Sequence, residues 1–192
     1  MHKIVLATSN AGKLQEFQTL LAPLQWEVLP QSQFAISSIE ETGSTFVENA
    51  LLKARHAAQL TGLPALADDS GLVVDALNGA PGIYSARYGG INVLLTALAD
   101  IPAEQRTARF YCVLVYLKHP ADPMPLIAQG TWEGRILFAP QGKQGFGYDP
   151  VFYVPTHQCS AAELAPDLKN QLSHRGQALR QLLVGLNKLL FS

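Results

Sequence analysis

Apolar residues recur along this 192-residue chain with two different periods, which predict a mixture of strands and helices. Short runs of consecutive apolar residues are typical of buried strands, whereas apolar residues three or four positions apart are typical of amphipathic helices. The first pattern predicts strands at residues 3–7, 26–29, 65–67, 72–74, 107–117, 126–137 and 151–154. The second predicts helices at residues 12–22, 46–60 and 93–99, and a final helix capped by Ser173. Together they indicate an α/β or mixed α+β domain around a mixed sheet.

The predicted helix at residues 46–60 has two different faces. Small residues suited to close packing lie on one face: Ala50, Ala54 and Ala57. Asn49, Lys53 and His56 are spaced i, i+4 and i+7, so they fall on one polar stripe. The pattern predicts a helix with one closely packed face and one polar stripe.

Composition and charge exclude several classes of protein. Lys and Arg number 14 and Asp and Glu 15, so the formal net charge is −1, and charged residues make up 15% of the chain against about 25% in soluble proteins. Binding to duplex nucleic acid or an anionic membrane needs a surplus of cations that this chain lacks. A hydrophobic content of 48% excludes a disordered chain. Any phosphate binding must therefore be local.

Neither a membrane span nor a disulfide framework is expected. The longest purely apolar run, Tyr111–Leu117, is far shorter than the roughly 18 residues that cross a bilayer. The apolar stretch near the N-terminus is too short for a signal peptide. Cys112 and Cys159 lack a metal-ligand spacing and are typical of free thiols in a reducing compartment. We therefore expect a cytoplasmic protein.

Polar residues follow the first predicted strand, from Thr8 to Lys13. Hydroxyls, an amide, helix N-terminal N–H groups and one lysine converge there, which suits an anion. The segment is not a Walker A loop, since Leu14 stands where Ser or Thr would hold Mg²⁺. Capping of the helix by Ser9 or Asn10, with a solvated lysine, explains the same residues.

Two interpretations compete for the segment Asp68-Asp69-Ser70-Gly71. Turns prefer these residue types, so the segment favours a turn between two strands. Adjacent carboxylates between apolar strands repel each other, however, unless a cation or a proton shares the site. Mg²⁺ would supply that cation, because it takes oxygen ligands and arrives with substrate phosphates. Glu40 and Glu41 could add a further carboxylate or lie in a solvated loop.

Two segments nearer the C-terminus are candidates for ligand binding. In Gly145–Pro150, glycines let the backbone approach a ligand and an aromatic ring can stack on a base. A glycine-rich hairpin with its aromatics in the core has the same composition. Lys169 and His174-Arg175 place cations near the start of the final helix, where they oppose the helix dipole. A bound anion or acceptor would compensate for this, and so would exposure to solvent.

Taken in order, these segments resemble the inosine/xanthosine triphosphate pyrophosphatase family over almost the whole chain. That family cleaves non-standard purine nucleoside triphosphates to the monophosphate and pyrophosphate. The resemblance rests on Thr8–Lys13, Glu40–Ala54, Ala67–Leu72, Gly79–Tyr88, Gly145–Pro150 and Ser173–Gly176. One departure is the short connection after Tyr88, where the family usually has a longer polar segment.

The resemblance implies one domain over residues 1–192, with a long mixed sheet flanked by helices and two lobes around a nucleotide-binding cleft. It also implies a Mg²⁺-dependent enzyme that acts on ITP, dITP and XTP, usually as a homodimer. Asp69 would be the proton acceptor, and Glu40, Asp69 and Asp68 would bind Mg²⁺. The residues that would bind the substrate are Thr8, Ser9, Asn10, Ala11, Gly12, Lys13, Lys53, Ser70, Phe146, Gly147, Tyr148, Asp149, Lys169, His174 and Arg175.

Three other functions are considered beside this one. A related pyrophosphatase with a preference for pyrimidine or modified nucleotides would be distinguished by its substrates. A nucleotide-binding regulatory module would have lost turnover, but both aspartates and both lysines, Lys13 and Lys53, are present. A nucleic-acid binding protein would bind polynucleotides with a steep dependence on salt.

Overall fold

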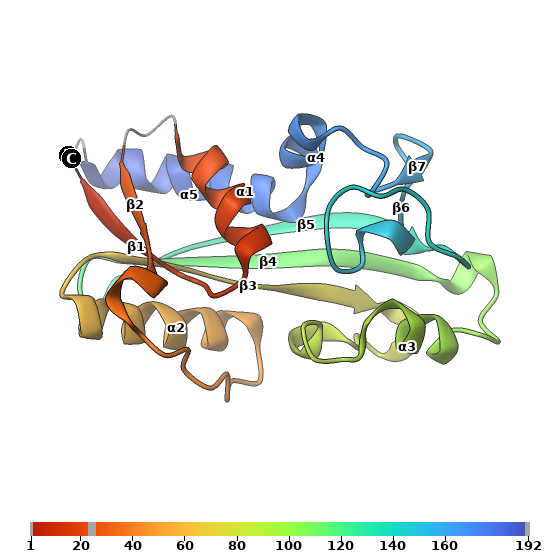
Figure 1. Ribbon diagram of the computed structural model, residues 1–192, viewed down its shortest axis with the longest axis horizontal. Helices are drawn as coiled ribbons and strands as arrows, with labels where there is room; N and C mark the ends of the chain where they lie inside the picture. The colour runs from red at the N-terminus through yellow and green to blue at the C-terminus, as the bar shows by residue number, and fades with distance from the viewer. Residues whose placement is uncertain (1, 23–25, 191–192) are drawn as a thin grey trace. The chain divides into compact units, whose positions relative to one another are not determined.

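The computed structural model describes residues 2–22 and 26–190 and confirms the predicted mixture of strands and helices (Figure 1). The α-helices are α1 (Ala11–Leu21), α2 (Phe46–Thr61), α3 (Gly90–Ala97), α4 (Pro166–Leu172) and α5 (His174–Leu190). The strands are β1 (Lys3–Ala7), β2 (Glu27–Pro30), β3 (Ala65–Val74), β4 (Thr107–Leu117), β5 (Leu126–Ile136), β6 (Phe152–Val154) and β7 (Cys159–Ser160). Short 3₁₀ helices are η2 (Gln31–Phe34), η3 (Asp75–Leu77), η4 (Gly82–Tyr84), η5 (Ala103–Gln105) and η6 (Asp149–Val151).

Most of the predicted elements are confirmed, with ends that differ by a few residues. The prediction of two strands around a turn at residues 68–71 was wrong, because β3 runs through this segment without a break. Asp68 and Asp69 remain buried within the strand. Lysines from two helices contact them there, so their charges are balanced without a turn that exposes them to water. Sequence patterning also missed α4 and β7, which are too short for a periodic signal.

The strands form one mixed sheet in the order β2-β1-β3-β4-β5-β6-β7. Strand β1 pairs in parallel with β2 and with β3, and Ala7 faces Ala67 in the second pairing. Strand β6 pairs antiparallel with both β5 and β7. Because parallel strands end at the same edge of a sheet, the residues after Ala7 and after Ala67 begin side by side.

The chain divides into two compact units. Unit 1 comprises the residues up to Asp69, Val113–Gln129 and the residues from Ala178 onward. Unit 2 comprises Ser70–Cys112 and Gly130–Gln177. Strands β3, β4 and β5 and helix α5 each contribute residues to both units.

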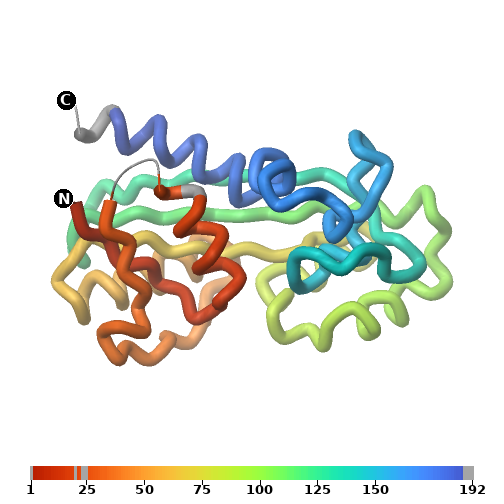
Figure 2. The backbone as a smooth tube through the Cα atoms, turned by 45° about the horizontal axis from the view of Figure 1, so that its top comes forward, coloured from red at the N-terminus to blue at the C-terminus, as the bar shows by residue number. Residues whose placement is uncertain are grey.

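The core of unit 1 forms around β1 and α2. The apolar residues Ile4–Ala7 are buried, and α2 packs against β1. The small residues predicted to form the packing face of α2 are fully buried: Ala50, Ala54 and Ala57. Figures 1 and 2 show α2 and the unit 1 part of α5 on opposite sides of the unit 1 strands. The absence of large side chains on this face of α2 lets its backbone approach the sheet closely.

The core of unit 2 is richer in aromatic side chains. Phe110, Trp132 and Phe152 pack together, with ring centroids of Phe110 and Phe152 4.4 Å apart. Helix α5 begins at this core, and Ser173 caps it: its Oγ accepts a hydrogen bond from the Gly176 N–H at 3.2 Å, as predicted. In the described ranges 2–22 and 26–190, no helix is both long and apolar enough to span a membrane.

Candidate active site

The loop between β1 and α1 forms a capped helix N-terminus in unit 1. Asn10 is the N-cap, and its Oδ1 accepts a hydrogen bond from the Lys13 N–H at 3.1 Å. The Asn10 N–H in turn donates to Thr8 Oγ1 at 3.2 Å, while Ser9 is exposed. The capping interpretation is therefore confirmed for Asn10, but its solvated lysine was wrong, because Lys13 is largely buried and pairs with Asp68 of β3. No acidic residue lies in the first turn of α1, so nothing in the turn offsets the partial positive charge at Ala11 and Gly12.

Asp68 and Asp69 lie in β3, directly after the register pair of Ala67 with Ala7. Consecutive side chains of an extended strand point to opposite faces of the sheet. Each carboxylate meets a lysine from a different helix: Asp68 pairs with Lys13 of α1, and Asp69 Oδ1 lies 3.0 Å from the Lys53 Nζ of α2. The two aspartates are therefore neutralised separately, and their mutual repulsion is reduced.

Lys53 bridges two carboxylates. Its Nζ donates to Glu41 Oε1 at 2.7 Å and to Asp69 Oδ1 at 3.0 Å. Burial lowers the pKa of Lys53, but the nearby charges of Asp69, Asp68 and Glu41 outweigh this effect and raise it. Lys53 is therefore a stable cation in the site.

The pKa of Asp69 is shifted by its surroundings. Burial raises its pKa above the ordinary aspartate value, and the charge of Lys53 opposes this rise. Its Oδ2 is buried, and no group in the described part of the chain donates a hydrogen bond to it. Asp69 thus has one oxygen held by a lysine and one buried oxygen without a hydrogen-bond partner in the described part of the chain, which makes it a candidate for a functional carboxylate.

The segment from Ile36 to Thr45, which precedes α2, is held along that helix by side-chain contacts. Asn49 Oδ1 accepts from the Gly43 N–H at 2.8 Å, and Glu48 Oε2 accepts from the Ser44 and Thr45 N–H groups at 2.9 Å. His56 Nε2 lies 3.0 Å from the Ser37 carbonyl oxygen. The polar stripe Asn49, Lys53 and His56 thus faces this segment.

Glu40 lies in the same segment, between these contacts. Its side chain is exposed, and the lysine bridge uses its neighbour Glu41 instead. Among the residues that the structure describes, no three His, Cys, Asp or Glu side chains come close enough together to make a preformed metal cage. A cation at this site would therefore have few protein ligands, which is how Mg²⁺ usually binds beside substrate phosphates.

A second group of predicted residues gathers in unit 2 around Asp149. Its Oδ2 accepts from the Phe146 N–H and from Lys169 Nζ, both at 2.8 Å. Gly145 has φ +76°, and a Cβ at this position would collide with the Asp149 carboxylate. Asp149 and Lys169 are buried, so the interpretation of Lys169 as a solvated cation was wrong. The buried ion pair fixes the loop that carries Phe146.

Phe146 lies close to two cations. Lys169 Nζ is 5.0 Å and the Arg175 guanidinium carbon 5.1 Å from the centroid of its ring. Arg175 Nη2 also donates to Ser70 Oγ at 3.1 Å, and Arg175 is buried. An aromatic ring and hydrogen-bond donors therefore occur together, as a site for a heterocyclic base requires.

The remaining predicted residues of unit 2 surround this group. His174 is buried and stacks on Phe110, with ring centroids 4.8 Å apart and planes at 13°. Tyr148 is buried, its hydroxyl donates to the Ser85 carbonyl at 3.1 Å, and burial raises its pKa. Gly147 has φ +60°, which a glycine adopts without strain. Of the two aromatics in this loop, Tyr148 thus lies in the core and Phe146 is half-buried.

Sequence reasoning gave no role to three residues that shape these two groups. Ser85 accepts from the Leu72 N–H at 2.9 Å and links the strand after Ser70 to the loop at Tyr148. Phe110 supports His174. His56 was placed on the polar stripe of α2, and that spacing was a usable signal for a segment packed along the helix.

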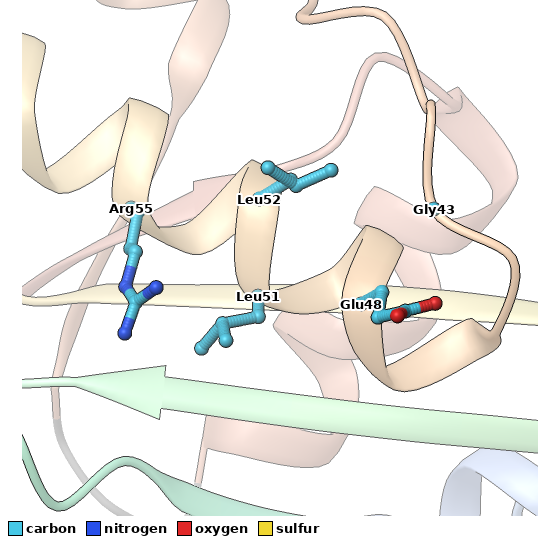
Figure 3. A pocket seen from close by; sticks show the side chains of 5 residues that line it. All are labelled: Gly43, Glu48, Leu51, Leu52 and Arg55. Carbon is cyan, nitrogen blue, oxygen red and sulfur yellow. The ribbon is translucent and has the colours of Figure 1, made fainter.

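One surface hollow is lined by Gly43, Glu48, Leu51, Leu52 and Arg55 (Figure 3). It contains none of the residues predicted to bind metal or substrate. The chemistry described above therefore lies elsewhere on unit 1, at Lys53 and the two aspartates.

We expect Asp149→Asn to weaken both the loop at Phe146 and the binding of a base. Asparagine keeps an acceptor for the Phe146 N–H but removes the charge that balances the buried Lys169. Removing one partner of a buried ion pair costs about 3–5 kcal/mol, and the acceptor that asparagine keeps should hold the fall in the free energy of unfolding near the lower end of that range. Urea unfolding measures this change, and the KM for a nucleotide should rise with it.

The variant Asp167→Asn is the control for this prediction, because it makes the same chemical change at an exposed position of α4. It should leave both stability and KM close to those of the unchanged protein. Equal unfolding free energies for the Asp149 and Asp167 variants would contradict the structural role of the buried pair.

Comparison with known proteins places this chain in a family. The model of the Ham1 family matches residues 4–184 of the chain. The chain belongs to the Ham1 family. It is 56% identical over 196 residues to a dITP/XTP pyrophosphatase of Vibrio cholerae, covering 98% of each chain. It is 55% identical over 194 residues to a dITP/XTP pyrophosphatase of Escherichia coli O157:H7, covering 97% of this chain and 98% of the relative.

Solved structures agree with this assignment. A HAM1 protein from Coxiella burnetii superposes with a TM-score of 0.89 at 55% identity, covering 98% of this chain and all of that one. The Ham1 protein of Staphylococcus aureus gives a TM-score of 0.84 at 39% identity, over 97% of this chain and 98% of that one. The mixed-sheet fold is therefore that of the Ham1 family.

Proposed function

We propose that this Ham1 family chain hydrolyses the non-standard purine nucleoside triphosphates ITP, dITP and XTP to the monophosphate and pyrophosphate. Its curated relatives named dITP/XTP pyrophosphatase support the substrate class. The observation that carries the chemistry is Asp69, a buried carboxylate with Oδ1 on Lys53 and an open Oδ2. This activity would remove the damaged nucleotides from the precursor pool.

The triphosphate would bind to the groups around the start of α1. The N–H groups of Ala11 and Gly12 and the ammonium of Lys13 present positive charge there, and Thr8, Ser9 and Asn10 add polar atoms. Lys53 supplies a second cation. Two lysines and a helix N-terminus give the local phosphate binding that a net charge of −1 still permits.

Mg²⁺ is part of this proposal, and the residues present fit it. Asp69 Oδ2 is a buried oxygen without a hydrogen bond, and Glu40 is an exposed carboxylate in the segment fixed by Glu41. These oxygens would hold the ion, and substrate oxygens and waters would complete its shell. Asp68 points to the other face of β3 and would support the site only through its ion pair with Lys13. The bound ion would neutralise charge on the pyrophosphate leaving group.

Asp69 would then act as the proton acceptor. Hydrolysis between the α and β phosphates requires a water aligned with the α phosphorus. A carboxylate with a raised pKa accepts a proton from that water more readily than an ordinary aspartate. Lys53 holds Oδ1, which leaves Oδ2 as the oxygen that would face both the ion and the attacking water.

The base would be selected by the cluster in unit 2. Phe146 offers its ring for stacking, and Arg175 and His174 offer donors for the 6-oxo group of hypoxanthine or xanthine. Adenine presents an amino group instead and would leave a buried donor unpaired, which costs about 1–3 kcal/mol. Ser70, Gly147, Tyr148, Asp149 and Lys169 would complete the pocket for base and sugar.

A substrate panel tests the proposal. ITP, dITP, XTP, GTP, ATP and CTP are incubated separately with the protein and Mg²⁺, and the products are separated by ion exchange. We expect monophosphate and pyrophosphate from ITP, dITP and XTP, and little product from the other three. Orthophosphate with a diphosphate would overturn the proposed reaction, and preference for CTP would favour a pyrimidine enzyme.

Two further experiments identify which phosphorus the water attacks and whether turnover needs Mg²⁺. In H₂¹⁸O, attack at the α phosphorus puts the label into the monophosphate, whereas attack at the β phosphorus puts it into pyrophosphate. We expect label in the monophosphate alone. EDTA should abolish turnover and added Mg²⁺ should restore it, whereas full activity in EDTA would exclude the ion.

We further propose that the protein is a cytoplasmic homodimer with no nucleic-acid or membrane partner. Light scattering should give twice the chain mass of 20.8 kDa. Filter binding at low salt should retain no polynucleotide. Retention would require a surplus of surface cations, and the formal net charge of the chain is −1.

A further inference from the structure

We infer that His56 is a positioning residue, which fixes the Glu40 segment so that Glu40 can share a cation with Asp69. The inference deepens the proposed function and rests on it. His56 lies on the same helix as Lys53, and its ring contacts the Ser37 carbonyl rather than either aspartate, so its effect would be indirect.

The geometry of the segment supports this role. Residues 36–45 form no helix or strand, and they run antiparallel to α2. Their contacts along the helix follow in order: Gly43 at Asn49, Glu41 at Lys53 and Ser37 at His56. These three helix positions share one face, because they are spaced i, i+4 and i+7.

Glu40 falls between two of these contacts. On its downstream side, Glu41 is tied to Lys53 at 2.7 Å. On its upstream side, His56 contacts the Ser37 carbonyl at 3.0 Å, and Gln31 makes a longer contact of 3.5 Å with Ser38. The shorter upstream contact is therefore the one that limits how far Glu40 can move from α2.

The contact with a carbonyl oxygen determines which ring nitrogen of His56 carries a proton. A carbonyl oxygen can only accept a hydrogen bond, so His56 Nε2 carries the proton and donates it. An alanine would lose this donor. A glutamine carries an amide N–H₂ on a chain long enough to reach the same oxygen, so it should restore part of the contact.

Loss of the contact should weaken cation binding more than chemistry. The segment would sample more conformations, and only some would bring Glu40 to the cation, so the apparent affinity falls with the competent fraction. One hydrogen bond corresponds to roughly a fivefold change in such an equilibrium. Turnover at saturating Mg²⁺ should change little, because Asp69 and Lys53 are not altered.

Three variants separate this role from a general effect on α2: His56→Ala, His56→Gln and Arg55→Ala. Arg55 is the neighbouring helix residue and is exposed, and Figure 3 shows its side chain directed away from the loop at Gly43. Arg55→Ala therefore truncates the neighbouring side chain of α2 to alanine while leaving the His56 contact to the segment in place.

The first measurement needs neither metal nor substrate. Hydrogen–deuterium exchange of the metal-free protein reports on the amides of residues 36–43. We expect faster exchange in His56→Ala, intermediate exchange in His56→Gln, and unchanged exchange in Arg55→Ala. Unchanged exchange in His56→Ala would overturn the inference.

The second measurement is binding of Mn²⁺, as a paramagnetic substitute for Mg²⁺, followed by electron paramagnetic resonance with a non-hydrolysable ITP analogue. We expect roughly fivefold weaker binding in His56→Ala, partial rescue in His56→Gln, and no change in Arg55→Ala. Equal Mn²⁺ affinity in all three variants would overturn the inference even if the unaltered protein is an active pyrophosphatase. Failure of the unaltered protein to release pyrophosphate would instead count against the proposed function.

Discussion

Asp69→Asn should lower turnover of ITP by about 10²–10⁴-fold, the usual contribution of a positioned proton acceptor. Asparagine has nearly the same shape and keeps an oxygen that can accept from Lys53, so the fold and the lysine bridge should remain. It cannot accept a proton from water at neutral pH. Steady-state kinetics with a pyrophosphate assay measures the loss, and calorimetry with ITP should still detect nucleotide binding.

The same role predicts a pH dependence. Burial raises the pKa of Asp69 above the ordinary value of 3.8, so the carboxylate becomes protonated at a higher pH than a free aspartate. Since the ionised form is the one that accepts a proton, kcat/KM should fall as the pH is lowered through that raised pKa.

Asp75→Asn is the matched control for Asp69→Asn. Asp75 lies in an exposed group with Thr107 and Arg109, so this variant should keep full turnover. Equal activity in the Asp69 and Asp75 variants would contradict the assigned role.

Periodicity predicted most of the fold because its elements are long or strongly apolar. Strand β4 was predicted at its observed bounds, and its alternation of buried and half-buried residues explains why. The prediction of a turn within β3 failed because the rule for turns considers residue types alone. Asp68 and Asp69 look like turn residues until their lysines are known, and Lys13 and Lys53 lie 55 and 16 positions away in the chain.

In the candidate site too, local sequence rules predicted some features, and contacts between distant residues decide the others. Local rules found the capped N-terminus at Asn10 and the cap at Ser173, because both depend on residues within one helical turn. They could not decide between Glu40 and Glu41. Which of two adjacent carboxylates reaches Lys53 depends on how the segment packs along α2, and that path is set by contacts at Asn49 and His56.

Lys13→Met should be the most destabilising of the substitutions considered. Lys13 pairs with Asp68, whose side chain is completely buried, while the lysine side chain is 15% exposed. Removing one partner of a buried ion pair leaves a carboxylate in a site of low polarity without its cation. The free energy of unfolding should therefore fall by about 3–5 kcal/mol at neutral pH, as measured by urea unfolding. The KM for ITP should rise as well, because the phosphates lose a cation.

A second substitution separates the two effects. In Lys13→Met with Asp68→Asn no uncompensated charge remains, so most of the lost stability should return, whereas the phosphate-binding cation stays absent and KM stays high. Lys3→Met is the control: its partner Glu27 is exposed, and such surface pairs contribute about 0–1 kcal/mol. If Lys13→Met and Lys3→Met unfold at the same urea concentration, Asp68 does not depend on Lys13. If the double variant has both the stability and the KM of the unchanged protein, Lys13 stabilises the fold and does not bind the phosphates.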